Sequence, residues 1–444
     1  MTHRAATVVK RFERISLHAR TFAVMACCLA SVCSAQSPIE ILDQAREKLL
    51  HFTRSLPKYT CTETIDREYF LPPPVKGRLL TNTAGLACPA FLPESLPSTP
   101  AYLDRVRLEV TVAEGREIHA WPGANEFDTR RIDEIIDGPT STGEFGTYLI
   151  EIFDNPASHF TYIGETTVNG RKLLEYSYRT DVEGSHYRVS GSRIRTAHSG
   201  SFEIDRDTLE LVRLAIETDA LPPEIGMCRT STKVEYHSVP IGDGGLILPI
   251  QSELQVLEPG PRISRARTTF SACHEYAARS SIHFDDEDPA VAAARKSQLV
   301  STTTPSGIHF TLRTIAPIDL SVAAAGDRIS ARVTETSNPK ILPKGAIVSG
   351  RITRLRHFMA GRHVFQIAIA LDTAIAADVS MRLGAIPDRH RKGPGLPING
   401  MKSRGTYLAF PPLGSTPQEA FTTFPGDTKI VKPGFESSWI TAVP

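Results

Sequence analysis

Three carboxylates alternate along one predicted ribbon and come closest to an enzymatic arrangement. Glu203, Asp205 and Asp207 occupy every second position, so a strand would place them on one face. Two carboxylates about 5 to 9 Å apart can divide the acid and base roles of glycoside cleavage. However, Asp205 and Asp207 flank an expected turn, where aspartate is favoured because it bonds the local backbone. We therefore expect no catalytic residue here, and an envelope hydrolase that uses these carboxylates is the weakest of our functional hypotheses.

Metal and cofactor patterns are equally sparse. His357, His363 and His390 are the candidate imidazole ligands, but they match no known spacing of zinc ligands. The acidic run 285–288 could hold calcium, although it lacks the interspersed glycine of a calcium loop. The chain contains neither His-Glu-x-x-His nor Gly-x-Ser-x-Gly. We expect no metal and no cofactor, and we favour a protein that is not an enzyme.

The cysteines indicate disulfide chemistry. Three of the seven cysteines stand in the first 35 residues, and the four that remain are Cys61, Cys88, Cys228 and Cys273. An even number in an exported chain predicts two disulfides, with three possible connectivities. We favour Cys61 with Cys88 and Cys228 with Cys273, because each bond would close a local unit. A metal site is the competing interpretation, but no two of these cysteines are close in sequence.

Residues 1–35 have the pattern of an export signal. Basic residues precede the apolar run Phe22–Val32, which is too short to span a bilayer, and Cys33-Ser34-Ala35 offers small residues for cleavage. Val24-Met25-Ala26-Cys27 is a poor match to a lipoprotein acylation box, so we do not expect lipid anchoring. No later segment predicts a transmembrane span. A periplasmic or secreted location follows.

Charge is distributed unevenly along the chain, although the total is only +1. Residues 1–35 carry five basic and one acidic side chain and residues 301–444 carry 17 basic and 9 acidic, so the stretch between them is net −11. Such asymmetry suggests that the basic end docks on the acidic middle or faces an anionic surface, while a solvated face stays open as an alternative. Nucleic acid is not an expected partner, because no aromatic residues interleave the basic run.

The stretch 200–276 predicts an antiparallel meander. Apolar and polar residues alternate along it, and Asp-rich, Pro and Gly turns interrupt it. Further strands are expected at 59–70, 160–164, 172–180 and 186–190, with a hairpin at 105–112 and 116–121. The fold class is therefore mainly β with a few covering helices (α+β): a curved antiparallel sheet or half-barrel, followed by a small β-barrel or sandwich.

Two helices are expected to accompany the sheet. Residues 38–56 have helical spacing of apolar residues, and 144–154 form a short helix whose apolar face would cover the sheet. Trp121, at the end of the hairpin, and Tyr148 and Phe153, on the short helix, are the candidates for a ligand face. A role of these side chains in the ordinary core stays open, and burial tendencies favour it for Trp121.

Composition divides the chain into four parts. These are a signal peptide at 1–35, a half-barrel domain at 36–284, a linker at 285–306 and a basic β domain at 307–444. In the last part we expect strands at 309–314, 328–334, 346–355 and 364–371, a loop at 384–405, and closing strands at 429–431 and 437–442.

The order of helix, strand, hairpin, covering helix and meander resembles the half-barrel of periplasmic lipoprotein carriers, the LolA-like proteins. More narrowly, the region looks like uncharacterised exported bacterial proteins with comparable stretches, which here are Tyr59-Thr60-Cys61, Trp121-Pro122-Gly123, 200–205 and 270–276. The resemblance implies a concave apolar sheet that shelters acyl chains. The chain departs from the carriers by its size, its cysteines and a Pro-rich insertion.

The last part resembles the β-barrel of TrbI-type proteins from conjugation and secretion outer rings. The residues that carry this likeness are Ile318-Asp319, Gly326-Asp327, 341–346 and Val348-Ser349-Gly350. Because these are mainly turn elements, they concern the fold more than chemistry. The resemblance implies contact with an envelope protein.

Two non-enzymatic hypotheses follow. In the first, an exported envelope protein shelters a lipid or another apolar ligand in the curved sheet. In the second, the protein is a structural or assembly component that binds a protein partner, and the sheet is simply a packed core. Inward-facing residues look alike in a hollow and a filled sheet, so the sequence alone leaves both open.

Overall fold

The computed structural model describes residues 36–55, 58–70, 88, 99–113, 116–124, 130–189, 192–241, 244–260, 262–275, 302–359, 363–376, 379–388 and 418–443. The predicted signal peptide and all but the last residues of the predicted linker lie outside this range. Within it, the chain is mostly antiparallel β structure with few helices, which confirms the predicted fold class. The proposed domain boundaries stay predictions.

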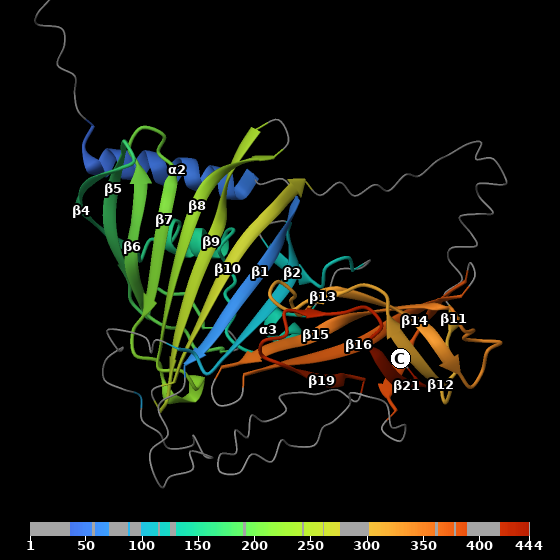
Figure 1. The fold of residues 1–444 in the computed structure, drawn as a ribbon. Helices are drawn as coiled ribbons and strands as arrows, with labels where there is room; N and C mark the ends of the chain where they lie inside the picture. Colours follow the sequence, from blue (N-terminus) through green and yellow to red (C-terminus); the bar gives the residue numbers. More distant parts are fainter. Residues whose placement is uncertain are drawn as a thin grey trace, which may run out of the picture. The chain divides into compact units, whose positions relative to one another are not determined.

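One curved antiparallel sheet dominates the first half of the described chain (Figure 1). Its strands, in the order in which they pair, are β4 (His159–Val168), β5 (Arg171–Thr180), β6 (His198–Asp205), β7 (Leu211–Thr218), β8 (Arg229–Ile241), β9 (Gly244–Glu258), β10 (Arg262–Glu275), β1 (Tyr59–Phe70), β2 (Tyr102–Ala113) and β3 (Arg116–Ala120). Successive side chains of a strand point to opposite faces. Burial alternates accordingly along most of β8, where Thr230, Thr232 and Val234 are buried and Lys233 is exposed.

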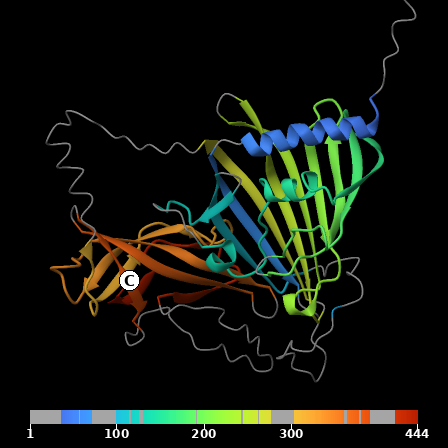
Figure 2. The ribbon, with the colours of Figure 1, turned by 180° about the vertical axis from the view of Figure 1, so that it is seen from behind.

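Residues 131–156, here called the cover, lie against the concave face of this sheet and include α3 (Ile132–Ile135) and α4 (Thr147–Phe153) (Figure 2). Ile132 and Ile136 pack into a buried cluster with Leu254 and Val256 of the sheet. The predicted covering helix is thus confirmed as α4. The expected N-terminal helix is also present, as α2 (Pro38–Ser55).

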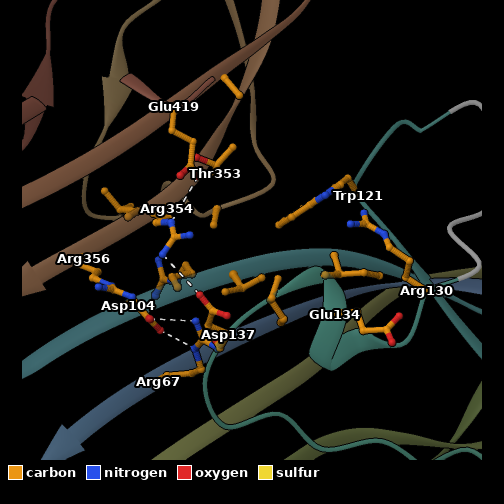
Figure 3. Close-up of a pocket in the computed structure, with 17 residues that line it drawn as sticks. Arg67, Asp104, Trp121, Arg130, Glu134, Asp137, Thr353, Arg354, Arg356 and Glu419 are labelled. Carbon is orange, nitrogen blue, oxygen red and sulfur yellow. Dashed lines mark hydrogen bonds and ion pairs between the residues drawn. The ribbon is translucent and has the colours of Figure 1, made fainter. Parts of the chain in front are cut away.

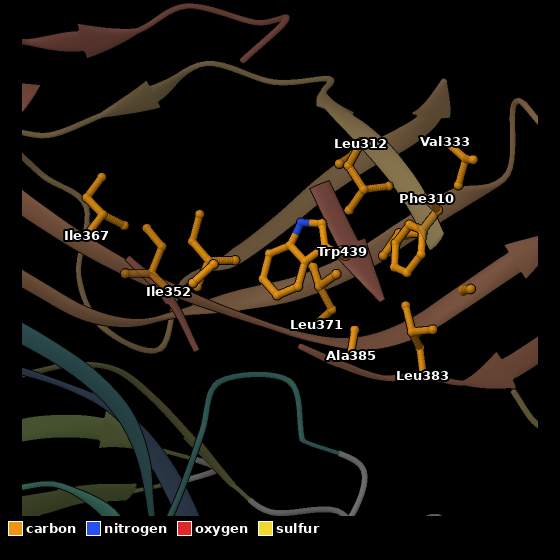
Figure 4. Close-up of a cluster of buried hydrophobic side chains, with 14 of the residues drawn as sticks. Phe310, Leu312, Val333, Ile352, Ile367, Leu371, Leu383, Ala385 and Trp439 are labelled. Atoms are coloured by element: carbon orange, nitrogen blue, oxygen red, sulfur yellow. The ribbon is translucent and has the colours of Figure 1, made fainter. Parts of the chain in front are cut away.

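The C-terminal half forms a second β region with a separate core (Figure 4). Its strands are β11 (Thr302–Thr303), β12 (His309–Thr314), β13 (Ile318–Asp319), β14 (Arg328–Thr336), β15 (Ile347–Phe358), β16 (Val364–Ala376), β17 (Val379–Arg382), β18 (Gly384–Pro387), β19 (Ala420–Pro425), β20 (Ile430–Val431) and β21 (Glu436–Ala442). Trp439 is almost fully buried and packs in the same cluster as Phe310, Leu312 and Leu371. The strands predicted in this part are all present, together with shorter ones that the sequence did not indicate.

Backbone pairing joins the two β regions. The start of β2 pairs with the end of β15, so that Asp104 stands opposite Arg356 and Tyr102 opposite Phe358. The backbone N–H of Arg107 also donates to the carbonyl of Ala325 at 2.7 Å. The basic C-terminal region therefore contacts the N-terminal sheet through main-chain hydrogen bonds, in addition to ion pairs such as Arg107 with Asp327.

Three expectations are wrong. The disulfides join Cys61 to Cys273 and Cys88 to Cys228. The first bond forms because β1 and β10 are neighbouring strands and bring these two distant cysteines together. Residues 186–189 form no strand; they run as irregular chain beside the cover. Part of the predicted loop at 384–405 is strand β18, which pairs with β21, and the rest of that loop from residue 389 lies outside the described residues.

Candidate functional site

The larger of two cavities lies between the concave face and the cover, with a volume of about 1370 Å³. Strands β1, β8, β9 and β10 supply its floor, the cover supplies one wall, and residues 186–189 and Ser192 supply another. Its apolar and aromatic lining is Tyr69, Phe70, Tyr102, Ile132, Tyr148, Ile150, Tyr187, Val189, Met227, Leu254, Val256 and Ile263. Charged side chains also line it, among them Arg116, Asp133, Glu151, Arg188 and Arg262. The cavity therefore offers an amphipathic surface.

Aromatic contacts hold the cover on the sheet at two points, near its middle and near its C-terminal end. Phe145 meets Phe270 of β10 edge to face, with ring centroids 4.9 Å apart, and Phe153 meets Phe202 of β6 in the same way. The Arg46 guanidinium of α2 donates two hydrogen bonds to the carbonyl of Phe153, at 2.8 and 3.1 Å. The cover residues that line the cavity lie on both sides of Phe145 in the sequence.

A carboxylate on β3 holds the middle of the cover. The two oxygens of Glu117 accept the backbone N–H groups of Gly143, at 2.7 Å, and Phe145, at 3.0 Å. Gly143 has a φ of +115°, and a Cβ at this position would lie 2.9 Å from the ring of Tyr148. A side chain is thus excluded where the cover bends towards Glu117.

Glu117 belongs to a buried acidic cluster with Glu63, His119 and Glu144. The Nε2 of His119 lies 3.3 Å from Oε2 of Glu63, and Ser252 of β9 donates to Glu144 at 3.0 Å. Burial, followed by the charge of Glu117, raises the pKa of Glu144 to about 8, so this side chain is protonated at neutral pH. Such shifts are common at functional sites, but here the groups bond the cover to the sheet.

The same surroundings shift the pKa values of Glu117 and His119. Burial raises the pKa of Glu117 above its usual value, although the nearby imidazole of His119 and the two backbone donors oppose this shift. Burial lowers the pKa of His119, but the hydrogen bond and charge of Glu63 outweigh it and raise the pKa overall. Since Glu117 and His119 also line the cavity, its lining is polar where β3 contributes to it.

A second, smaller cavity of about 310 Å³ lies where the two β regions meet (Figure 3). Arg67 and Asp104, each 6% exposed, form a bidentate ion pair with distances of 2.6 and 2.9 Å. Arg354 lies between Asp137, at 3.5 Å, and Glu419, at 3.4 Å. Carboxylates thus already engage these guanidinium groups, and this cavity is the weaker candidate for a ligand site.

The predicted ligand-face residues lie in three different places. Tyr148 lines the larger cavity, and its hydroxyl lies 3.0 Å from that of Ser141. Trp121 lines the smaller cavity, with the guanidinium of Arg351 5.6 Å from its ring centroid. Phe153 lines neither cavity; it packs among Phe160 and Phe202. Their role in ligand binding stays a prediction.

The carboxylates of the ribbon have structural partners. Asp205 accepts the backbone N–H groups of Asp207 and Thr208 at 2.9 Å each and an N–H of Arg171 at 2.7 Å, which confirms the turn interpretation. Burial alone would raise the pKa of Asp205, but these hydrogen bonds lower it below the usual value. Glu203 pairs with Arg213 at 3.0 Å.

Two of the three candidate imidazole ligands belong to the described residues. His357 and His363 flank the loop between β15 and β16, with ring centroids 6.3 Å apart, and His390 lies outside the described residues. The described part of the chain contains no group of three or more side chains suited to a metal ion. None of its helices is long and apolar enough to cross a bilayer.

Sequence reasoning missed the acidic cluster and most of the cavity lining. One signal was present, because Glu117 and His119 alternate on a predicted hairpin strand and so share its inward face. The contribution of residues 186–189 had no comparable signal, since an irregular segment shows no periodicity.

No family model and no curated protein matches the chain. Among solved structures, a LolA superfamily protein from Nitrosomonas europaea is 10% identical with a TM-score of 0.26, covering 57% of this chain and 99% of that one. A DUF1329 family protein from Desulfovibrio piger is 12% identical with a TM-score of 0.27, covering 56% and 98%. A putative outer membrane lipoprotein-sorting protein domain from Vibrio parahaemolyticus is 10% identical with a TM-score of 0.27, covering 56% and 96%. These values carry no argument about function, and the TrbI-type resemblance stays a prediction.

Proposed function

We propose that this chain is an exported, non-enzymatic protein of the cell envelope that binds a lipid or another apolar ligand in the larger cavity. The observation that carries the proposal is the cavity of about 1370 Å³ between the sheet and its cover, with aromatic and aliphatic side chains along its floor and walls. Ligand sites in proteins are concave, mostly apolar and typically 300–1,000 Å³, so this space is large enough for a lipid-sized molecule.

Two further observations support the proposal. The two disulfides suit an oxidising compartment, in agreement with the export signal expected at residues 1–35. The two carboxyl groups whose pKa values burial raises, Glu117 and Glu144, bond the cover and the sheet to each other, which gives them a structural task. Binding without chemistry therefore accounts for the site.

Native mass spectrometry of the protein from its natural compartment, followed by organic extraction, tests the proposal. We expect a stoichiometric apolar ligand. Ile150 of α4 is 40% exposed and lines the cavity, so Ile150→Glu places a charge there and should lower ligand occupancy at least tenfold. Ile163→Glu is the matched control, because Ile163 of β4 is 56% exposed and lies outside the lining. A clean apo mass for the unmodified protein would contradict the proposal.

A further inference from the structure

Two polar groups on the floor of the larger cavity have no hydrogen-bond partner among the described residues. They are the hydroxyl of Ser264 and the Nε–H of Arg262, both on β10. Ser264 is only 3% exposed, so its hydroxyl also has little access to bulk water. A buried donor without a partner costs free energy, and native proteins contain few of them. Both groups therefore point to a partner that the described residues do not supply.

The register of the sheet places these two groups on one face. Residues two apart on a strand share a face, about 6.6 Å from each other along the chain. Ser264 stands opposite Tyr69 of β1 on one side and Val256 of β9 on the other, and both of these residues line the cavity. The ring of Tyr69 stacks on that of Tyr102, with centroids 4.1 Å apart. The polar pair thus lies among apolar and aromatic walls.

The guanidinium of Arg262 is only partly engaged. Its Nη2 pairs with Glu258 at 3.0 Å, and both side chains are about one third exposed. The Nε–H is buried and has no partner among the described residues. With the hydroxyl of Ser264, this N–H offers two donors to one acceptor group. Guanidinium donors match the oxygens of carboxylates and phosphates, and such charge-assisted bonds are about twice as strong as neutral ones.

We infer that the ligand of this cavity is an amphipathic anion whose carboxylate or phosphate oxygens are bound by Arg262 and Ser264, with its apolar chain along Val256 and Leu254. The inference rests on the proposed function and specifies the ligand class. A fatty acid and a phosphate-bearing lipid share the chemistry that these two donors recognise.

Calorimetric titration of the delipidated full chain with three probes of equal length tests the inference. The probes are dodecanoate, dodecyl phosphate and uncharged dodecanol. We expect at least one of the anions to bind about tenfold or more tightly than the alcohol, since hydrogen bonds to charged groups exceed neutral ones. A preference for dodecanoate would identify fatty acids as the source, and a preference for dodecyl phosphate would identify phospholipids.

Variants of the two donors test whether Arg262 and Ser264 cause the preference for an anion over the alcohol. Arg262→Gln and Ser264→Ala should each lower the ratio of anion to alcohol affinity about three- to tenfold, while alcohol binding stays unchanged and shows that the cavity is intact. Arg267→Gln and Ser271→Ala are matched controls, because these residues lie exposed on the same strand and outside the cavity lining. If the Arg262→Gln variant also loses alcohol binding, the same titrations are made with Arg262→Lys, because lysine keeps the positive charge but places its donor elsewhere.

The outcomes distinguish a failure of the anion inference from a failure of the proposed function. Equal affinity of the unmodified protein for all three probes overturns the anion inference and leaves the proposed function standing. An anion preference that survives both the arginine variant and Ser264→Ala also overturns it. If the unmodified protein binds none of the three probes, the proposed function itself fails.

Discussion

The carboxylate of Glu117 on β3 accepts the backbone N–H of Gly143, in the segment that covers the sheet, at 2.7 Å. A side chain of the sheet thus holds the cover at hydrogen-bonding distance. The second oxygen of Glu117 accepts the N–H of Phe145 at 3.0 Å, so one carboxylate bonds two backbone donors of the same turn. The larger cavity begins beside this attachment.

Replacing this carboxylate should weaken the attachment. Glu117→Gln leaves one carbonyl oxygen for two backbone donors, and we expect a loss of about 1–2 kcal/mol in the free energy of unfolding. Removing the charge should also lower the pKa of Glu144, because Glu117 helps to raise it. Urea unfolding measures the first effect, and an NMR titration of the Glu144 carboxyl measures the second. Glu175→Gln, on β5, is the control; an unchanged Glu144 pKa would contradict the coupling.

Stability should depend on pH through Glu144. Its pKa rises from the usual 4.5 to about 8 in the folded protein, so between these values the folded state binds more protons than the unfolded state. Stability is then greatest at and below about pH 4.5 and declines as the pH rises to about 8. Glu144→Gln removes this titration while it keeps a donor and an acceptor.

The comparison between the two proteins isolates this contribution. Unfolding free energies measured from pH 5 to pH 9 should fall less steeply for Glu144→Gln than for the unmodified protein, with a difference of more than about 1 kcal/mol at pH 9. Parallel curves for the two proteins would show that Glu144 ionises normally in the folded state.

Loss of one charge from the buried ion pair between Arg67 and Asp104 should strongly destabilise the fold. Both side chains are 6% exposed, so Asp104→Asn leaves a buried guanidinium without its counter-charge and should cost about 3–5 kcal/mol. Asp66→Asn is a matched control on the adjacent strand, because Asp66 pairs with Arg105 while 49% exposed and should cost about 0–1 kcal/mol. Denaturant unfolding measures the free energy of unfolding of both variants. An equal decrease in the two variants would contradict the difference in burial between the two ion pairs.

Peptide mapping under non-reducing conditions should recover Cys61 linked to Cys273 and Cys88 linked to Cys228. The first bond closes a separation of 212 residues, and loop-closure entropy predicts that its removal by Cys61→Ser with Cys273→Ser destabilises the fold by about 3–5 kcal/mol. Recovery of Cys61 with Cys88 would contradict the arrangement of β1 beside β10.

Local patterning made much of this fold predictable from the sequence. The alternation along β8, β9 and β10 and the helical spacing at 38–55 depend on neighbouring residues only, so they are visible in the chain itself. The disulfide pairing is different, because it depends on β10 closing against β1 across more than 200 residues. A prediction that pairs cysteines by their closeness in sequence cannot identify a contact between such distant strands.

The site was less predictable than the fold. Tyr148 was predicted on the inner face of a covering helix and does line the cavity, whereas Phe153 of the same helix packs into a separate aromatic cluster. A helical pattern shows which face is apolar, but it does not show which part of that face meets another side chain. The donors at Arg262 and Ser264 could be identified only from the structure, which shows that both are buried without a hydrogen-bond partner among the described residues.

Photoaffinity labelling with a diazirine-bearing fatty acid, followed by peptide mapping, tests the central claim most directly. If the larger cavity binds the apolar ligand, labels should fall on the peptides that carry Ile150, Leu254 and Val256, and an excess of unlabelled fatty acid should remove them. Labels that fall only outside the cavity lining, or that persist under competition, would contradict the account.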